Sequence, residues 1–154
     1  MKKIFIPFLI FCLACNEDKE KDNTAVPSDV YQKTEAPELE NGCYKMIAQN
    51  DSAFLKIKVE DSIVTGDLHY RWFEKDKNDG TIRGVIKDSL LIANYTFNSE
   101  GRSSVREVIF KIKNDTLIEG FGDISMKSVD TVKFKNISHL NFMHDRQFIK
   151  IACN

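Results

Sequence analysis

From Gly42 to the C-terminus, apolar and polar residues alternate along the chain, and turn-forming residues interrupt the alternation at short intervals. A period of two residues is typical of β-strands that bury one face, because successive side chains of a strand point to opposite sides. The pattern predicts eight strands and a short ninth strand near the end of the chain. We expect them at 43–49, 53–60, 63–72, 81–87, 90–98, 103–113, 116–124, 131–135 and 147–153.

The turns between these strands predict how neighbouring strands pair. We place two-residue turns at 50–51, 61–62, 88–89 and 114–115 and a four-residue turn at 99–102. Met46 then lies opposite Leu55, which in turn lies opposite Leu68 on the next strand. Apolar residues face apolar residues in every hairpin, and a slip by one residue would turn every side chain to the other face. The agreement favours an antiparallel meander.

Only one face of this meander is apolar, so the sheet must close on itself or pack against a second sheet. About eight antiparallel strands in residues 42–154 fit a small up-and-down barrel. The all-β pattern and the length of this region resemble the lipocalin or calycin-like barrels of small bacterial lipoproteins. The lipocalin Gly-x-Trp motif is absent, since Gly42-Cys43-Tyr44 stands in the comparable place.

The N-terminus has the features of an export signal. Lys2 and Lys3 precede an apolar run of ten residues, 4–13, which is too short to span a hydrocarbon core of about 30 Å. Leu13-Ala14-Cys15 follows and resembles the lipobox of bacterial lipoproteins. The resemblance implies that residues 1–14 are a signal peptide and that Cys15 is lipidated, which anchors the protein to a membrane. A plain secretory signal with incidental cysteines is the alternative.

Residues 15–41 read as a disordered tether between this anchor and the barrel. The stretch holds eight acidic residues against three lysines and few large apolar residues, so it cannot bury enough surface to offset its ordering entropy. Asn16-Glu17-Asp18 resembles the acidic export signal of Bacteroidota lipoproteins, which implies a lipid-anchored protein of the outer membrane. The periplasmic and the surface-exposed faces both remain open.

Charge and composition exclude several functional classes. The formal net charge of −1 is the sum of a basic signal (+2), an acidic tether (−5) and a slightly basic barrel region (+2), so no segment has the basic surplus that nucleic-acid binding requires. His69, His139 and His144 lack the spacing of metal ligands. No nucleophile motif surrounds any serine. We therefore expect a monomer without enzymatic activity, metal or cofactor.

One polar cluster falls on the inward face of the predicted barrel. The register places Arg106 between Tyr95 on one neighbouring strand and Asp123 on the other. It also sets Glu119 opposite Phe110. A buried arginine needs a carboxylate partner, because an unpaired buried charge is very costly. One interpretation is an internal ion pair that plugs the barrel, and the other is a clamp for an anionic or polar ligand.

The longer loops place the clamp at one end of the barrel. Residues 73–79, 99–102 and 125–130 form this end, and binding sites concentrate in such loops. The predicted ligand-binding residues are Tyr70, Trp72, Tyr95, Phe97, Arg106, Glu119 and Asp123.

Two further features concern covalent chemistry. Cys43 and Cys153 either form a disulfide, which an exported compartment permits, or remain buried thiols. Five turns read Asp, hydroxyl residue, apolar residue, and this resembles the O-glycosylation motif of Bacteroidota envelope proteins. The candidate acceptors are Ser52, Ser62, Ser89, Thr116 and Thr131. Ordinary turn preferences for Asp and Ser also account for the pattern.

Two functional hypotheses follow. The protein is either a tethered module whose barrel binds a small ligand at its open end, or a structural or interaction lipoprotein, inhibitor-like or sensor-like, that contacts another envelope protein. In the second case the protein's own side chains fill the barrel. A cavity of several hundred Å³ would favour the first hypothesis.

Overall fold

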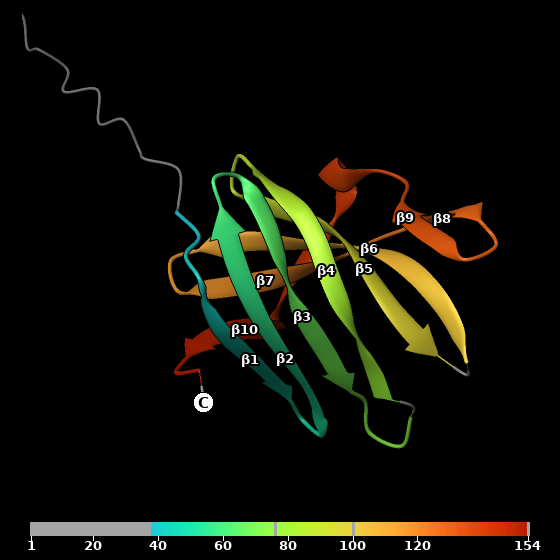
Figure 1. The fold of residues 1–154 in the computed structure, drawn as a ribbon, viewed down its shortest axis with the longest axis horizontal. Coiled ribbons are helices and arrows are strands. Elements are labelled where there is room, and N and C mark those ends of the chain that lie inside the picture. The colour runs from blue at the N-terminus through green and yellow to red at the C-terminus, as the bar shows by residue number, and fades with distance from the viewer. Residues whose placement is uncertain (1–37, 76, 100, 154) are drawn as a thin grey trace, which may run out of the picture. The chain divides into compact units, whose positions relative to one another are not determined.

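The computed structural model describes residues 38–75, 77–99 and 101–153, which form ten strands and one short helical turn (Figure 1). The strands are β1 (Gly42–Ala48), β2 (Asp51–Glu60), β3 (Ile63–Arg71), β4 (Lys77–Lys87), β5 (Leu90–Ser99), β6 (Arg102–Lys113), β7 (Thr116–Phe121), β8 (Ile124–Ser128), β9 (Thr131–Phe134) and β10 (Asn141–Ile151). The turn η1 spans Ile137–His139. Within this part of the chain, no helix is long and apolar enough to cross a membrane.

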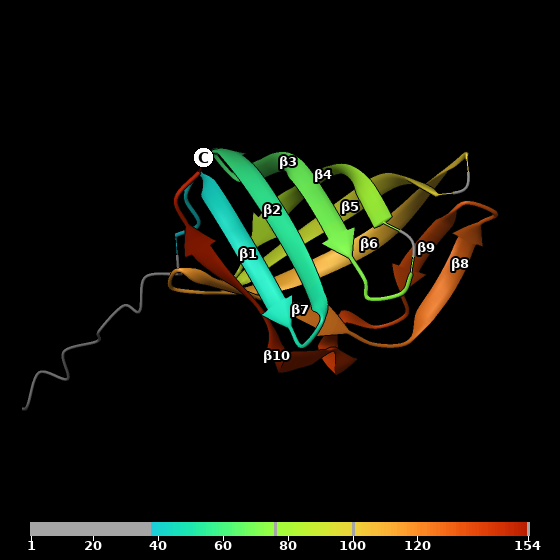
Figure 2. The same cartoon turned by 90° about the horizontal axis from the view of Figure 1, so that it is seen from below.

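Eight of the strands close into an antiparallel barrel. Strands β1 to β7 pair in sequence order, and β10 lies between β7 and β1, so the hydrogen-bonded circuit has no free edge (Figures 1 and 2). Closure removes the exposed edges that an open sheet would leave. The predicted all-β antiparallel barrel is therefore confirmed.

The last third of the chain closes the barrel differently from the prediction. The predicted strand 131–135 does not enter the ring. Instead β8 and β9 form a hairpin outside it, and β9 pairs in parallel with β6, with Thr131 opposite Val105 (Figure 2). The closing strand is β10, which begins six residues before the predicted start at 147. A register shift between Phe142 and Gln147 interrupts its alternation, which hides the strand in the sequence.

Most of the predicted hairpin registers are confirmed. Leu55 pairs with Leu68, as expected. The first hairpin differs, because its turn falls at residues 49–50 and Met46 consequently lies opposite Ala53 instead of Leu55. The shift is two residues, so each side chain keeps its face and the hydrophobic pattern cannot distinguish the two registers. Gln49 adopts the left-handed conformation (φ 55°) that such tight turns require.

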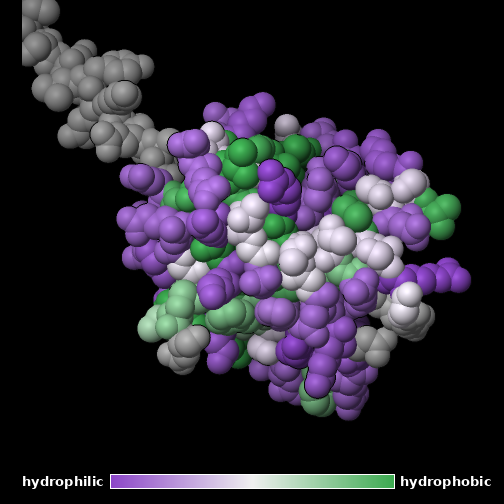
Figure 3. Space-filling model, in the orientation of Figure 1, coloured by the Kyte–Doolittle hydropathy of each residue, from purple (hydrophilic) through white to green (hydrophobic). Residues whose placement is uncertain are grey.

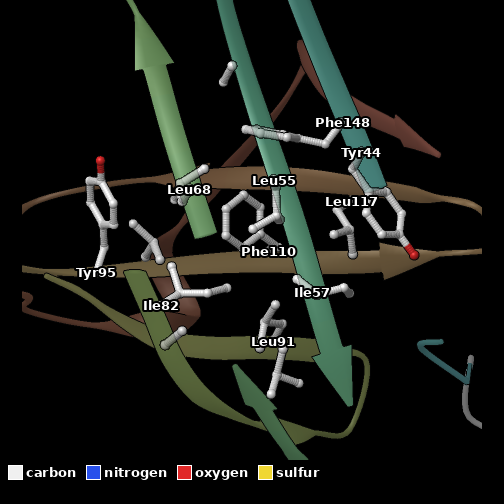
Figure 4. Close-up of a cluster of buried hydrophobic side chains, with 14 of the residues drawn as sticks. Tyr44, Leu55, Ile57, Leu68, Ile82, Leu91, Tyr95, Phe110, Leu117 and Phe148 are labelled. Carbon is white, nitrogen blue, oxygen red and sulfur yellow. The ribbon is translucent and has the colours of Figure 1, made fainter. Parts of the chain in front are cut away.

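Inward-facing side chains fill the barrel. Fully buried members of this core include Met46 and Val64 and seven residues that Figure 4 labels: Tyr44, Leu55, Leu68, Leu91, Phe110, Leu117 and Phe148. The rings of Phe110 and Phe148 meet edge to face at 5.3 Å. The outward positions carry the polar half of the alternation, and the face in Figure 3 is largely hydrophilic with apolar residues in small patches.

Strands β4 and β5 approach each other closely at Gly84. At Gly84, an added Cβ would lie only 2.5 Å from the Cβ of Ala93, so the pairing of β4 with β5 has no room for a side chain there. The Cys43–Cys153 disulfide is present, with a Cα–Cα distance of 5.3 Å, and it ties the end of β10 to the start of β1. This predicted bridge is confirmed.

Candidate functional site

The two ends of the barrel differ. Tight turns at 61–62, 88–89 and 114–115 cover one end, which we call the closed end. At the other end, β3 leads into β4 through a longer link and β7 leaves the ring toward the β8–β9 hairpin (Figure 2). We call this the open end, and the inward-facing positions near it carry most of the predicted ligand-binding residues.

Glu119 is the only buried charged residue in the described part of the chain, with 4% of its surface exposed. It lies on β7 opposite Phe110, as predicted. The Tyr70 hydroxyl donates a hydrogen bond of 2.7 Å to its Oε1 atom, whereas its Oε2 atom has no hydrogen-bond partner among the described residues. A buried oxygen without a partner is costly, so it marks a position where a further group would be stabilised.

Burial raises the pKa of the Glu119 carboxyl, because removal from water disfavours the charged form. The hydrogen bond from Tyr70 and the charges of Arg106 and Arg146 act in the opposite direction but do not cancel the effect. The same burial raises the pKa of Tyr70, and the nearby Glu119 adds to this shift. The net shift extends to higher pH the range in which Glu119 is a neutral acid, which has a hydroxyl donor as well as acceptors.

Aromatic rings line the interior beside this carboxyl. Tyr70 stacks on Trp72 at 5.0 Å, Tyr95 stacks on Phe97 at 4.8 Å, and Tyr70 and Tyr95 meet edge to face at 5.8 Å. The structure thus brings together all four predicted wall residues. Figure 4 shows Tyr95 and Tyr44 on opposite sides of the core. The Tyr95 hydroxyl is buried, and the described residues offer it no hydrogen-bond partner.

Arg146, on β10, completes the open end and was not predicted from the sequence. Its guanidinium lies 5.1 Å from the ring centre of Trp72 and 5.4 Å from that of Phe121, so two aromatic faces hold it. Its nearest described carboxylate is Asp51 at 3.9 Å, beyond hydrogen-bond distance. The Oδ1 atom of that carboxylate already accepts a hydrogen bond from the backbone N–H of Phe73.

A surface pocket of about 290 Å³ opens beside this arginine. Its lining residues are Asp51, Trp72, Phe73, Lys75 and Arg146. Arg146 lies in the register shift of β10, where alternation is lost, so only its proximity in sequence to Phe148 could have suggested an inward position. Two cations, one carboxylate and two aromatic rings favour a ligand that combines an anionic group with a planar body.

The two remaining predicted residues, Arg106 and Asp123, occupy different places. Arg106 lies opposite Tyr95 as expected, but its side chain is exposed, and the described residues hold no ion pair between it and Glu119 or Asp123. The expected position of Asp123 on the inward face is wrong. Strand β7 ends at Phe121, Asp123 is 89% exposed and lies 4.0 Å from Lys135, and Val132 of β9 occupies the place beside Arg106.

The candidate modification sites lie at turns or strand starts. Ser62 is exposed, and Ser52, Ser89, Thr116 and Thr131 are half-buried, so glycosylation stays a prediction. Cys15 lies outside the described residues. No cluster of metal-ligating side chains exists within 38–75, 77–99 and 101–153.

Comparison with known proteins adds no relative: neither a scan of family models nor searches of curated proteins and of solved structures finds a match for this chain. The interpretation of the site therefore depends on its own geometry.

Proposed function

We propose that this chain is a lipid-anchored bacterial envelope protein whose barrel binds a small ligand at the open end. Cys15 would carry the lipid, and residues 15–37 would tether the barrel to the outer membrane. The predicted tether is too long at its end, because Leu39 is buried in the barrel core and Glu40 pairs with Lys150. The ligand-binding role is supported above all by the two buried polar atoms of the open end, Glu119 Oε2 and the Tyr95 hydroxyl, which lack partners among the described residues. Native proteins pair nearly all such atoms, with their own groups, water or a ligand.

The surroundings of these atoms support the same proposal. Aromatic rings of Tyr70, Trp72 and Phe97 lie beside them, and Arg146 adds a preoriented donor at the surface. Ligand sites combine apolar walls with a few placed polar groups in this way. The closed end offers no comparable set, because its core residues are apolar apart from Tyr44.

Native mass spectrometry of the protein purified from the membranes of its host tests the proposal. We expect an acylated protein that retains an additional small molecule, and we expect Tyr95→Phe to lose that molecule. Tyr44→Phe is the matched control, because it removes a hydroxyl at the closed end. Retention by Tyr95→Phe and Tyr44→Phe alike would contradict the proposed site, and a folded wild-type protein without bound ligand in any preparation would contradict the function.

The filled core favours a second candidate, an interaction or structural lipoprotein. Core side chains fill the barrel, and the unsatisfied polar groups of its described interior are confined to Glu119 and Tyr95 at the open end. The β8–β9 hairpin meanwhile exposes Met126 (70%) and Val129 (83%) outside the ring. A crosslink from this hairpin to one envelope protein, abolished by Met126→Lys, would support this alternative.

A further inference from the structure

We propose that the ligand of the open end is an oxyanion on a planar apolar body, with the oxyanion on the Arg146 guanidinium and the planar body against Trp72 and Phe73. The proposal rests on the binding function proposed above and narrows the class of ligand. A carboxylate, a phosphate monoester and a sulfonate share the required chemistry.

The first argument for the oxyanion is the position of the Arg146 guanidinium. The guanidinium lies over the rings of Trp72 and Phe121, and its nearest described carboxylate is 3.9 Å away, so its N–H groups are available to a ligand. Those N–H groups match the two oxygen atoms of a carboxylate or phosphate. A planar group that holds such an oxyanion on Arg146 would lie beside Trp72, in the pocket that Phe73 and Lys75 also line.

The second argument is the balance of charges that line the pocket. Lys75 and Arg146 line the pocket against a single carboxylate, Asp51, which is 3.9 Å from Arg146 and already accepts the N–H of Phe73. Glu119 lies within electrostatic range of Arg146, but it does not line the pocket, and burial raises the pKa of its carboxyl. The positive charge of Arg146 is therefore only partly compensated, and an anion is the ligand that would compensate it.

Glu119 gives this site a dependence on pH. The groups that face it are Tyr70 from β3, Arg106 from β6 and Arg146 from β10, of which only Tyr70 hydrogen-bonds to it. A bound anion stabilises the neutral acid and is repelled by the carboxylate. Binding must therefore weaken as the pH rises through the pKa of Glu119, and Glu119→Gln must abolish this dependence while it leaves binding at low pH in place.

A matched set of naphthalene probes tests the proposal on the full-length folded protein. The anionic probes are naphthalene sulfonate, naphthoate and naphthyl phosphate, and naphthalenemethanol is the uncharged control with the same ring. Trp72 is the single tryptophan of the chain, so its indole N–H resonance reports binding at the pocket directly. The anions are expected to bind about tenfold to hundredfold more tightly than the alcohol, the gain typical of a charge-assisted hydrogen bond. The ranking of naphthoate against naphthyl phosphate identifies the natural headgroup.

Variants separate the arginine from general effects of charge. Arg146→Gln is expected to remove the preference for the anions and to leave binding of the alcohol unchanged. Arg83→Gln removes an exposed arginine on the outside of β4 and is expected to change neither. If Arg146→Gln does not fold, Lys75→Gln provides a second variant, with a smaller loss of the same preference.

The outcomes distinguish the two levels of the proposal. Equal affinity for anions and alcohol, with no effect of pH, would overturn the oxyanion inference and leave a ligand site at the open end. A Trp72 resonance that no probe shifts would overturn both the inference and the binding function.

Discussion

The buried carboxyl of Glu119 predicts an unusual pH dependence of folding stability. Its pKa is raised in the folded protein, because burial disfavours the charged form, so the folded state retains a proton that the unfolded state has already released. Between the pKa of this carboxyl in the unfolded state and its higher pKa in the folded state, the unfolded state binds fewer protons. The free energy of unfolding must therefore fall as the pH rises through this range. Within that window a single group changes the free energy of unfolding by at most about 1.4 kcal/mol per pH unit. Above the pKa of the folded state it causes no further change.

Glu119→Gln isolates this contribution. Glutamine has nearly the same shape, keeps an acceptor for the Tyr70 hydroxyl and cannot ionise, so it changes stability by an offset that does not depend on pH. Other titratable groups contribute equally to the stability of both proteins. Asp79, for example, stabilises the folded state more as the pH rises, because Arg71 and His69 lower its pKa. The difference between the wild-type protein and the variant therefore reports Glu119 alone.

Urea denaturation at a series of pH values, from the ordinary glutamate pKa of about 4.3 upward, measures this difference through the fluorescence of Trp72. We expect the stability of the wild-type protein relative to Glu119→Gln to decrease with rising pH. Glu74→Gln, at an exposed position, serves as the control and should parallel the wild-type protein. A wild-type curve that stays parallel to that of Glu119→Gln would refute the reasoning, because Glu119 would then titrate alike in both states.

Three further predictions concern stability. Removing the Cys43–Cys153 disulfide, whose cysteines are 110 residues apart, should cost about 4–5 kcal/mol on the chain-entropy model, measured as the shift in unfolding free energy on replacement of both cysteines by serine. Gly84→Val should destabilise the barrel by about 1–3 kcal/mol, since its Cβ would meet that of Ala93, and an unchanged melting temperature would contradict this. Tyr70→Phe should cost about 1–3 kcal/mol by leaving the buried carboxyl without its donor, and should move the pH dependence described above to higher pH.

The sequence predicted the barrel because its evidence is redundant. Five hairpins repeat the same inward face, and pairs such as Leu55 with Leu68 test one another, so a single misplaced turn does not change the architecture. The misplaced turn at 50–51 shows the limit of this redundancy. A shift of two residues preserves every face, and the true register shows in the turn, where Gln49 takes the left-handed conformation.

The errors occur where alternation carries no information. Strand β4 begins at Lys77, four residues before the predicted start, because its first inward positions are Asn78 and Gly80, which are not apolar. Asp123 was placed inside by extending an alternating pattern beyond the true end of β7. Arg146 escaped prediction for the converse reason, since a register shift breaks the pattern just where the chain turns this arginine toward Trp72.

The stability of the apolar core at the closed end explains how the open end tolerates Glu119. An unpaired buried oxygen costs about 1–3 kcal/mol, which is a large share of the stability of a small domain. The closed end offsets this cost, because its interdigitated core and the Cys43–Cys153 bridge stabilise the fold without any contribution from the open end. A ligand that satisfies Glu119 would recover that cost on binding, so a cognate ligand should raise the melting temperature of the wild-type protein more than that of Glu119→Leu. Equal shifts in the two proteins would show that the carboxyl takes no part in binding.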